Sequence, residues 1–239
     1  MANPTAAMLV IGDEILSGRT RDSNTHYLAN ELTRHGIRMA EARVVADDTP
    51  AIVAAVNALR AAYDHVFTSG GIGPTHDDIT ADAIAAAFGV AITHRADAMA
   101  LLQAHYDRSG LPFNDARQRM ARIPDGASLI ENPVSTAPGF TLGNVHVMAG
   151  VPRIFEAMVA SVMPTLTGGD PLLSQSLRVN RGEGEIAGPF GALAAEYPDL
   201  SMGSYPFIHN GAHGTNLVIR GTDAAQIDAA MTRLAELFT

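Results

Sequence analysis

Thr68-Ser-Gly-Gly-Ile-Gly-Pro-Thr-His-Asp-Asp-Ile-Thr80 is a glycine-rich junction between a short apolar run and an alanine-rich run. Residues 65–69 predict a buried strand, and residues 80–88 predict a helix. Three glycines lie on the turn between them. Glycine permits a positive φ and lets peptide N–H groups approach a ligand closely, while the start of a helix adds unpaired N–H donors and a positive dipole. The junction therefore predicts a binding site for phosphate or a similar anion.

Two adjacent carboxylates, Asp77 and Asp78, follow these glycines. A carboxylate about 4 Å from a phosphate oxygen costs about 4 kcal/mol at an effective dielectric constant of roughly 20, so a cation must lie between them. Mg²⁺ is a hard cation that binds carboxylate, water and phosphate oxygens together. We therefore predict a divalent metal site, most naturally for Mg²⁺, at Asp77 and Asp78. The alternative is structural: Thr80 caps the helix, and the two carboxylates stabilise its N-terminal dipole.

The composition excludes several kinds of site. The 239 residues include no Cys, and all sixteen basic residues are Arg. This excludes disulfides, cysteine nucleophiles, lysine Schiff bases and a phosphate-binding loop that ends in Gly-Lys. The net charge of −9 argues against nucleic acid and anionic membranes as partners. The apolar run at residues 6–11 is too short for a signal peptide or a membrane span, so we expect a cytoplasmic protein.

Strand-like and helix-like runs alternate along the first two-thirds of the chain. Expected strands lie at 6–11, 37–45, 65–69, 140–142 and 145–148, and expected helices at 23–35, 50–63, 80–88, 96–109, 115–122 and 153–165. This alternation predicts an α/β fold with a mostly parallel sheet flanked by helices. Ligands of such sheets bind beyond the carboxyl ends of the strands, so the loops that follow the first three strands are expected to converge.

Thr167-Gly-Gly-Asp-Pro171 is typical of a domain boundary. Beyond it, expected strands lie at 176–180, 200–205 and 215–220, and expected helices at 186–197 and 223–238. This pattern predicts a small α+β module. We therefore predict two domains, at residues 1–168 and 172–239.

Further polar residues follow the first two expected strands. Gly12, Asp13 and Glu14 come after the first strand, and Asp47 comes after the second. In a parallel sheet these residues would lie at the same edge as the glycine junction. The alternative is that they form ordinary polar turns and helix caps.

Taken in order, four blocks of sequence resemble the molybdopterin-binding domain of the MoaB/Mog type. The blocks are Gly12-Asp-Glu-Ile-Leu-Ser-Gly18 with Asp22-Ser-Asn-Thr25, Val44-Val-Ala-Asp47, the glycine junction, and Ser135-Thr-Ala-Pro-Gly-Phe140 with Gly150-Val-Pro152. The nearest likeness is to the N-terminal region of competence/damage-inducible protein A (CinA) and to the corresponding domain of FAD synthase, and it covers residues 6–165. Residues 172–239 look like the KH-type module that follows this domain in CinA. This copy has no basic Gly-x-x-Gly loop, so we expect no RNA binding.

The resemblance implies a three-layer fold with a pocket for a phosphorylated pterin, such as molybdopterin, or an adenine dinucleotide. It implies two essential aspartates, which align with Asp47 and Asp78, and metal-dependent cleavage of the diphosphate in ADP-ribose or FAD. The alternatives are a binding module without turnover and a molybdopterin adenylyltransferase. Relatives assemble as dimers or trimers, so we expect a homo-oligomer. The likeness does not extend to the amidase domain of CinA or to the FAD-forming domain of FAD synthase, so neither activity is expected.

The remaining residues expected to bind ligand come from the same blocks. They are Gly12, Asp13, Glu14, Asn24, Gly70, Gly71, Gly73, Pro74, Thr75, Thr80, Ser135, Pro138, Gly139, Gly150 and Pro152.

Overall fold

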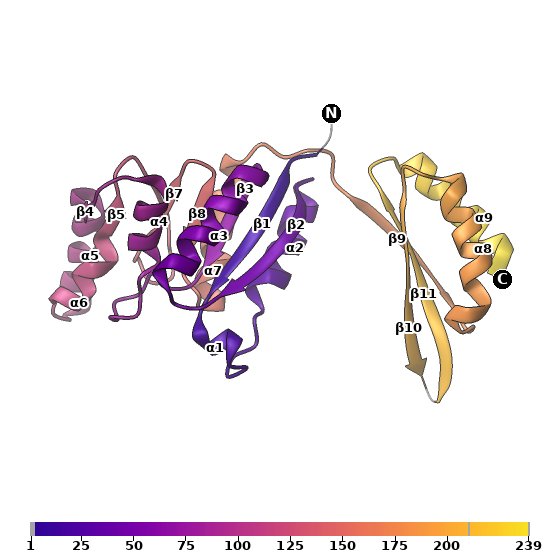
Figure 1. The fold of residues 1–239 in the computed structure, drawn as a ribbon, viewed down its shortest axis with the longest axis horizontal. Helices are drawn as coiled ribbons and strands as arrows, with labels where there is room; N and C mark the ends of the chain where they lie inside the picture. Colours follow the sequence, from indigo (N-terminus) through magenta and orange to yellow (C-terminus); the bar gives the residue numbers. More distant parts are fainter. Residues whose placement is uncertain (1–2, 210, 239) are drawn as a thin grey trace. The chain divides into compact units, whose positions relative to one another are not determined.

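The computed structural model describes residues 3–209 and 211–238. The chain folds into two compact units that divide between Gly169 and Asp170 (Figure 1). This division falls inside the segment 167–171 that the sequence marks as a boundary.

The first unit is built on a six-stranded sheet with the order β2-β1-β3-β8-β7-β6. The strands are β1 (Thr5–Ile11), β2 (Arg38–Val45), β3 (His65–Ser69), β6 (Ser128–Ile130), β7 (Gly139–Leu142) and β8 (Val145–Met148). Strands β2, β1, β3 and β8 pair in parallel, whereas β7 and β6 add two antiparallel pairings at one side. The predicted α/β fold with a mostly parallel sheet is confirmed.

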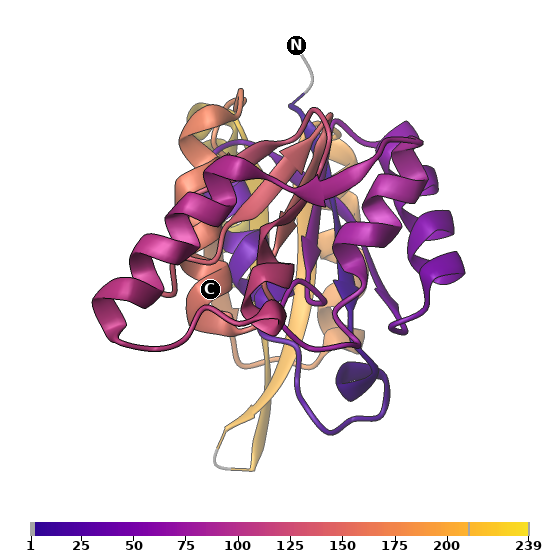
Figure 2. The same ribbon diagram turned by 90° about the vertical axis from the view of Figure 1, so that its left-hand side faces the viewer.

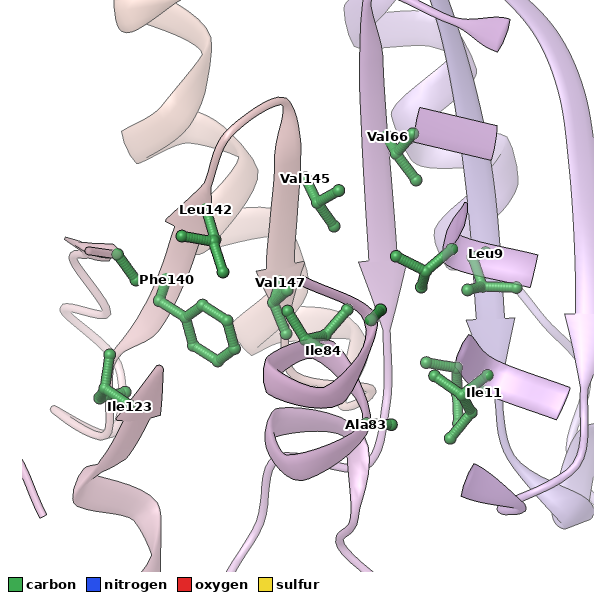
Figure 3. Close-up of a cluster of buried hydrophobic side chains, with 14 of the residues drawn as sticks. Leu9, Ile11, Val66, Ala83, Ile84, Ile123, Phe140, Leu142, Val145 and Val147 are labelled. Carbon is green, nitrogen blue, oxygen red and sulfur yellow. The ribbon is translucent and has the colours of Figure 1, made fainter. Parts of the chain in front are cut away.

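Helices cover both faces of this sheet, which gives the predicted three layers (Figure 2). The helices are α1 (Asp13–Leu16), α2 (Asn24–Arg34), α3 (Thr49–Ala62), α4 (Thr80–Phe88), α5 (Ala96–Ser109), α6 (Asp115–Gln118) and α7 (Pro152–Val162). Alternation along β1 assigns the faces, because successive side chains of a strand point in opposite directions. Leu9 and Ile11 pack with buried residues of α3, α4 and α5, as Figure 3 shows in part, whereas Met8 and Val10 pack with residues of α2 and α7.

One predicted helix is wrong in its second half. The helix expected at 115–122 ends at Gln118, and a 3-10 turn follows at Arg119–Ala121. Residues Arg122–Pro124 then form strand β5, which pairs with β4 (Ile92–His94). These strands and β6 have three residues each, which is too short for an alternating pattern to be read from the sequence. The helix expected at 153–165 likewise ends in a 3-10 turn at Met163–Thr165, where Pro164 interrupts it.

The second unit is a three-stranded antiparallel sheet, in the order β10-β11-β9, with two helices packed on one face. Its elements are β9 (Leu173–Val179), α8 (Glu183–Glu196), β10 (Ser201–His209), β11 (Ala212–Gly221) and α9 (Ala224–Phe238). These are the strands and helices of the α+β module that the sequence predicts, with longer strands. Within the described parts of both units, no helix has the length and apolar character needed to cross a membrane.

Candidate functional site

The carboxyl ends of four strands meet at one edge of the first unit. Ile11 of β1 lies beside Val45 of β2, and Ser69 of β3 lies beside both Val10 and Met148. The next residues continue this pairing, because the Gly12 N–H donates to Val45 O over 3.1 Å and the Gly70 N–H donates to Met148 O over 3.1 Å. Helix α1 lies just beyond the end of β1 (Figure 1). The loops that follow these strands enclose a cleft of about 520 Å³.

Most of the residues predicted to bind ligand or metal line this cleft. They are Gly12, Glu14, Asp47, Gly70, Gly71, Gly73, Pro74, Asp77, Asp78, Ser135, Gly150 and Pro152. The expected convergence of the loops is therefore present, although the role of each residue stays a prediction.

Three of the other predicted residues support residues of the cleft. The Asp13 N–H donates to Oδ2 of Asp47 over 3.0 Å. Asn24 is buried and donates from Nδ2 to Ser69 Oγ over 2.7 Å and to Gly150 O over 2.8 Å. It lines a smaller pocket of about 50 Å³, which shares Glu14, Gly150 and other lining residues with the cleft. Thr75 donates to Asp78, as described below.

The last three predicted residues lie away from the cleft surface. Thr80 is fully buried, and its hydroxyl donates to Gly70 O over 2.9 Å. It does not cap α4, because the residue at the N-cap position is Ile79. Gly139 is buried against Val147, where an added Cβ would lie 2.4 Å from the carbonyl oxygen. Pro138 lines a separate narrow crevice of about 20 Å³, which also borders the glycine loop, residues 70–73.

The glycine loop presents backbone donors with no protein partner. Gly70 and Gly71 have φ values of 112° and 68°, a region that favours glycine. Thr80 fixes this turn, since its N–H donates to Gly71 O over 2.9 Å in addition to the hydroxyl bond to Gly70. Within the described residues, no hydrogen bond uses the N–H groups of Gly71, Ile72 or Gly73. Free amides in a tight glycine turn are a suitable cradle for an anion.

Thr75 holds the carboxylate of Asp78 against this loop. Its N–H donates to Oδ2 of Asp78 over 2.8 Å, and its hydroxyl donates to the same oxygen. An added Cβ on Gly73 would lie 2.6 Å from that oxygen, so the carboxylate sits directly over the loop. The hydroxyl of Thr75 is close enough to Asp77 to lower the pKa of that exposed carboxyl as well, although its hydrogen bond goes to Asp78. No hydrogen bond from another described residue goes to Oδ1 of Asp78.

Asp47 has a perturbed environment. Burial raises its pKa above the ordinary value, the hydrogen bond from the Asp13 N–H opposes this, and the negative charges of Asp13, Glu14 and Asp77 raise it further. Since charge repulsion reaches Asp47 from both α1 and the glycine segment, these carboxylates share one electrostatic environment. Perturbed pKa values of this kind are concentrated at functional sites.

The cleft has an uneven charge balance. Four carboxylates line it, from Glu14, Asp47, Asp77 and Asp78, and none of its described lining residues is Arg or His. Arg119 and Arg122 border the crevice that shares the glycine loop with the cleft, and Arg119 donates from Nη2 to Asp78 O over a long 3.4 Å. An anion at the loop amides therefore needs a positive charge from outside the cleft wall.

The residues present fit a Mg²⁺ ion that is completed by a ligand. No group of three or more His, Asp or Glu side chains in the described residues is arranged to hold an ion by itself. Mg²⁺ usually takes one or two carboxylates and completes its shell with water and substrate phosphate oxygens. Asp78 and Asp77 supply such carboxylates beside the free amides, and Asp47 faces the same cleft.

An apolar wall completes the cleft, and the sequence did not single it out. The lining residues that were not predicted are Ile11, Thr20, Ile72, Met120, Asn132, Ala137, Ala149, Val151 and Ile154. Many are neighbours of predicted residues, so including whole loops would have found them. Met120 and Asn132 carried no such signal. Met120 belongs to the 3-10 turn that replaced part of the expected helix, and Asn132 lies outside the four blocks of sequence. A cleft with apolar walls and a few polar groups is typical of sites that bind small molecules.

Comparisons with known proteins assign both units to known families. Residues 7–168 match the probable molybdopterin binding domain, and residues 171–239 match the middle domain of FAD synthase. A probable FAD synthase of Caenorhabditis elegans is 32% identical over 98% of this chain and 50% of its own length. A CinA-like protein of Citrifermentans bemidjiense is 39% identical over 68% of this chain and 40% of its own length. The chain thus spans half or less of these two relatives.

A solved structure supports the same assignment. The crystal structure of CinA from Thermoplasma acidophilum matches with a TM-score of 0.63 and 34% identity, over 69% of this chain and 99% of that one. The family match covers well over half of the chain, in the unit that contains the cleft. The chain therefore belongs to the family of the MoaB/Mog-type molybdopterin-binding domain, here followed by an FAD synthase middle domain.

Proposed function

We propose that the cleft binds an adenine dinucleotide such as ADP-ribose or FAD and, with a divalent metal, hydrolyses its diphosphate. The main observation behind this proposal is that the free N–H groups of Gly71, Ile72 and Gly73 lie in the same cleft as four carboxylates. The amides favour a bound phosphate, whereas the carboxylates oppose it unless a cation intervenes. The FAD synthase and CinA-like names of the relatives support a nucleotide ligand.

The groups of the chain have separate tasks in this proposal. The amides of the glycine loop hold phosphate oxygens, and Asp78 and Asp77 provide the carboxylates for the metal. Bound Mg²⁺ would supply charge neutralisation at the phosphates. Asp47, whose pKa is raised, is suited to take a proton from the attacking water. Water adds to one phosphorus and the bridging P–O bond breaks, so ADP-ribose gives AMP and ribose 5-phosphate, and FAD gives AMP and FMN.

Two other functions use the same cleft. A binding module would retain molybdopterin or a nucleotide with the same amides and carboxylates but release no product. A molybdopterin adenylyltransferase would need ATP and molybdopterin together. The family name of the first unit favours a pterin ligand, so both are included in the test.

Replacing Asp47 or Asp78 by asparagine is expected to lower AMP release roughly 100-fold or more, because each change removes a charge that the reaction needs. The assay incubates purified protein with ADP-ribose or FAD, with Mg²⁺, Mn²⁺ or Co²⁺ and with EDTA, and measures AMP by chromatography. Asp125→Asn is the matched control, since Asp125 is an exposed aspartate that does not line the cleft. Chelation should abolish the release of AMP.

The outcomes separate the three functions. AMP release that is equal in wild type and in the double variant Asp47→Asn, Asp78→Asn would reject hydrolysis at this cleft. Saturable binding of molybdopterin or nucleotide without any product identifies a binding module. Transfer of AMP from ATP to molybdopterin identifies an adenylyltransferase.

A further inference from the structure

Thr136 has an unusual backbone conformation next to the cleft. Its φ is 67°, and it is the one described residue other than glycine with a positive φ. A branched Cβ makes this region unfavourable for threonine, so the surrounding structure must hold the residue there. Thr136 lies between Ser135 and Ala137, both of which line the cleft.

His105 of α5 provides one of the contacts that hold Thr136. Its Nδ1 lies 3.0 Å from Oγ1 of Thr136, within hydrogen-bonding distance. The Thr136 N–H also donates to Asn132 O over 2.9 Å. The strained residue is thus fixed by its side chain on one side and by its backbone on the other.

Asn132 organises the rest of this loop from a buried position. It is 6% exposed, and its Oδ1 accepts from the N–H groups of Val134 and Ser135, each over 3.1 Å. Its Nδ2 donates to Ser135 Oγ over 2.6 Å and to Ala137 O over 2.8 Å. All the hydrogen-bond donors and acceptors of this side chain therefore stabilise the conformation of residues 132–137.

This network leaves the hydroxyl proton of Ser135 unused. A serine hydroxyl has one donor and two acceptor positions, and Asn132 occupies an acceptor position. No hydrogen bond to another described residue uses the proton, and Ser135 faces the cleft. The hydroxyl is therefore able to donate to a ligand acceptor, such as a phosphate oxygen or a ring nitrogen.

We infer that Thr136 and His105 are positioning residues that keep the Ser135 hydroxyl directed into the cleft as a donor to the ligand. The inference rests on the proposed ligand-binding cleft but not on hydrolysis. Asn132 holds the Ser135 hydroxyl directly, and the contact with His105 holds the unfavourable φ of the next residue. Loss of that contact removes the side-chain bond that opposes the strain at Thr136, so we expect the loop, and with it the Ser135 hydroxyl, to shift. The backbone conformation at 136 matters in this account, and the chemistry of the threonine does not.

The test measures binding of the α,β-methylene analogue of ADP-ribose, whose diphosphate bridge cannot be hydrolysed, by calorimetry in the presence of Mg²⁺. Thr136→Val keeps the branched shape but loses the hydrogen bond, and it should weaken binding roughly fivefold, the equivalent of one ordinary hydrogen bond. His105→Ala and Ser135→Ala should weaken it by a similar factor. Thr136→Asn should bind as wild type does, because asparagine tolerates a positive φ.

A double-mutant cycle distinguishes positioning from a general structural role. If Thr136 acts through Ser135, Thr136→Val has no further effect in a chain that already carries Ser135→Ala. Additive losses, or unchanged affinity in Thr136→Val, would overturn the inference. So would a wild-type chain that does not bind the analogue. If the variants bind the analogue as expected but the wild-type protein releases no AMP, only the proposed hydrolysis is rejected.

Discussion

Gly70→Ala is expected to destabilise the first unit by about 4 kcal/mol or more. At its φ of 112° an added Cβ would lie 2.1 Å from the carbonyl oxygen of Ile11, which is backbone of β1, a strand paired on both sides, and cannot move aside. Strands β1 and β3 would have to separate at the edge of the sheet where the cleft forms. Calorimetry of the whole chain measures the loss, and hydrogen exchange of the β1 and β3 amides assigns it to this unit.

Gly89→Ala is the matched control. Gly89 ends α4 with a φ of 66°, and an added Cβ there meets no atom within 4 Å. Its substitution therefore costs only the left-handed conformation, about 1 kcal/mol. Similar losses in the two variants would show that close approach to Ile11 is not what requires glycine at position 70.

Acid is expected to destabilise the first unit through His146. This residue of β8 is 4% exposed, and burial together with the positive charge of neighbouring His65 lowers its pKa to about 3 from 6.5. Between these values the unfolded chain binds a proton that the folded chain does not, so stability is complete above about pH 6.5 and falls as the pH drops toward 3. The slope approaches about 1.4 kcal/mol per pH unit below the unfolded pKa, which amounts to roughly 2 kcal/mol between pH 6.5 and 4.5.

His146→Gln tests this expectation, because glutamine cannot titrate but retains a partner for Thr141, whose hydroxyl lies 3.0 Å from Nδ1 of His146. Whatever the substitution costs at pH 7.5, its urea-unfolding free energy should decline less steeply than that of wild type toward pH 4.5. His65 is also partly buried with a lowered pKa, so His65→Gln should remove part of the slope as well. Parallel curves for wild type and His146→Gln would show that the buried ring is not kept neutral by the fold.

Local pattern was sufficient for most of the architecture. Strand β3 and helix α4 have the bounds that their apolar runs predict, and the glycines between them mark the turn where positive φ values occur. Local pattern failed where an element depends on a distant partner. Arg122 was expected in a helix but lies in β5, because β5 pairs with β4. The carboxylate of Asp82 also accepts a hydrogen bond from the Arg122 guanidinium.

The fold class, the boundary between the units and the loops that form the cleft were all predictable from the order of residues, because each follows from hydrophobic period, glycine position and the parallel arrangement of strands. Which atoms of those loops line the cleft depends on how the folded chain packs. Thr80 and Gly139 belong to the right blocks yet lie beneath the surface, whereas Asn132 and Met120 line the cleft without any local signal. The pairing of Thr136 with His105 joins residues 31 positions apart, and such contacts depend on how helices pack on the sheet rather than on neighbouring residues.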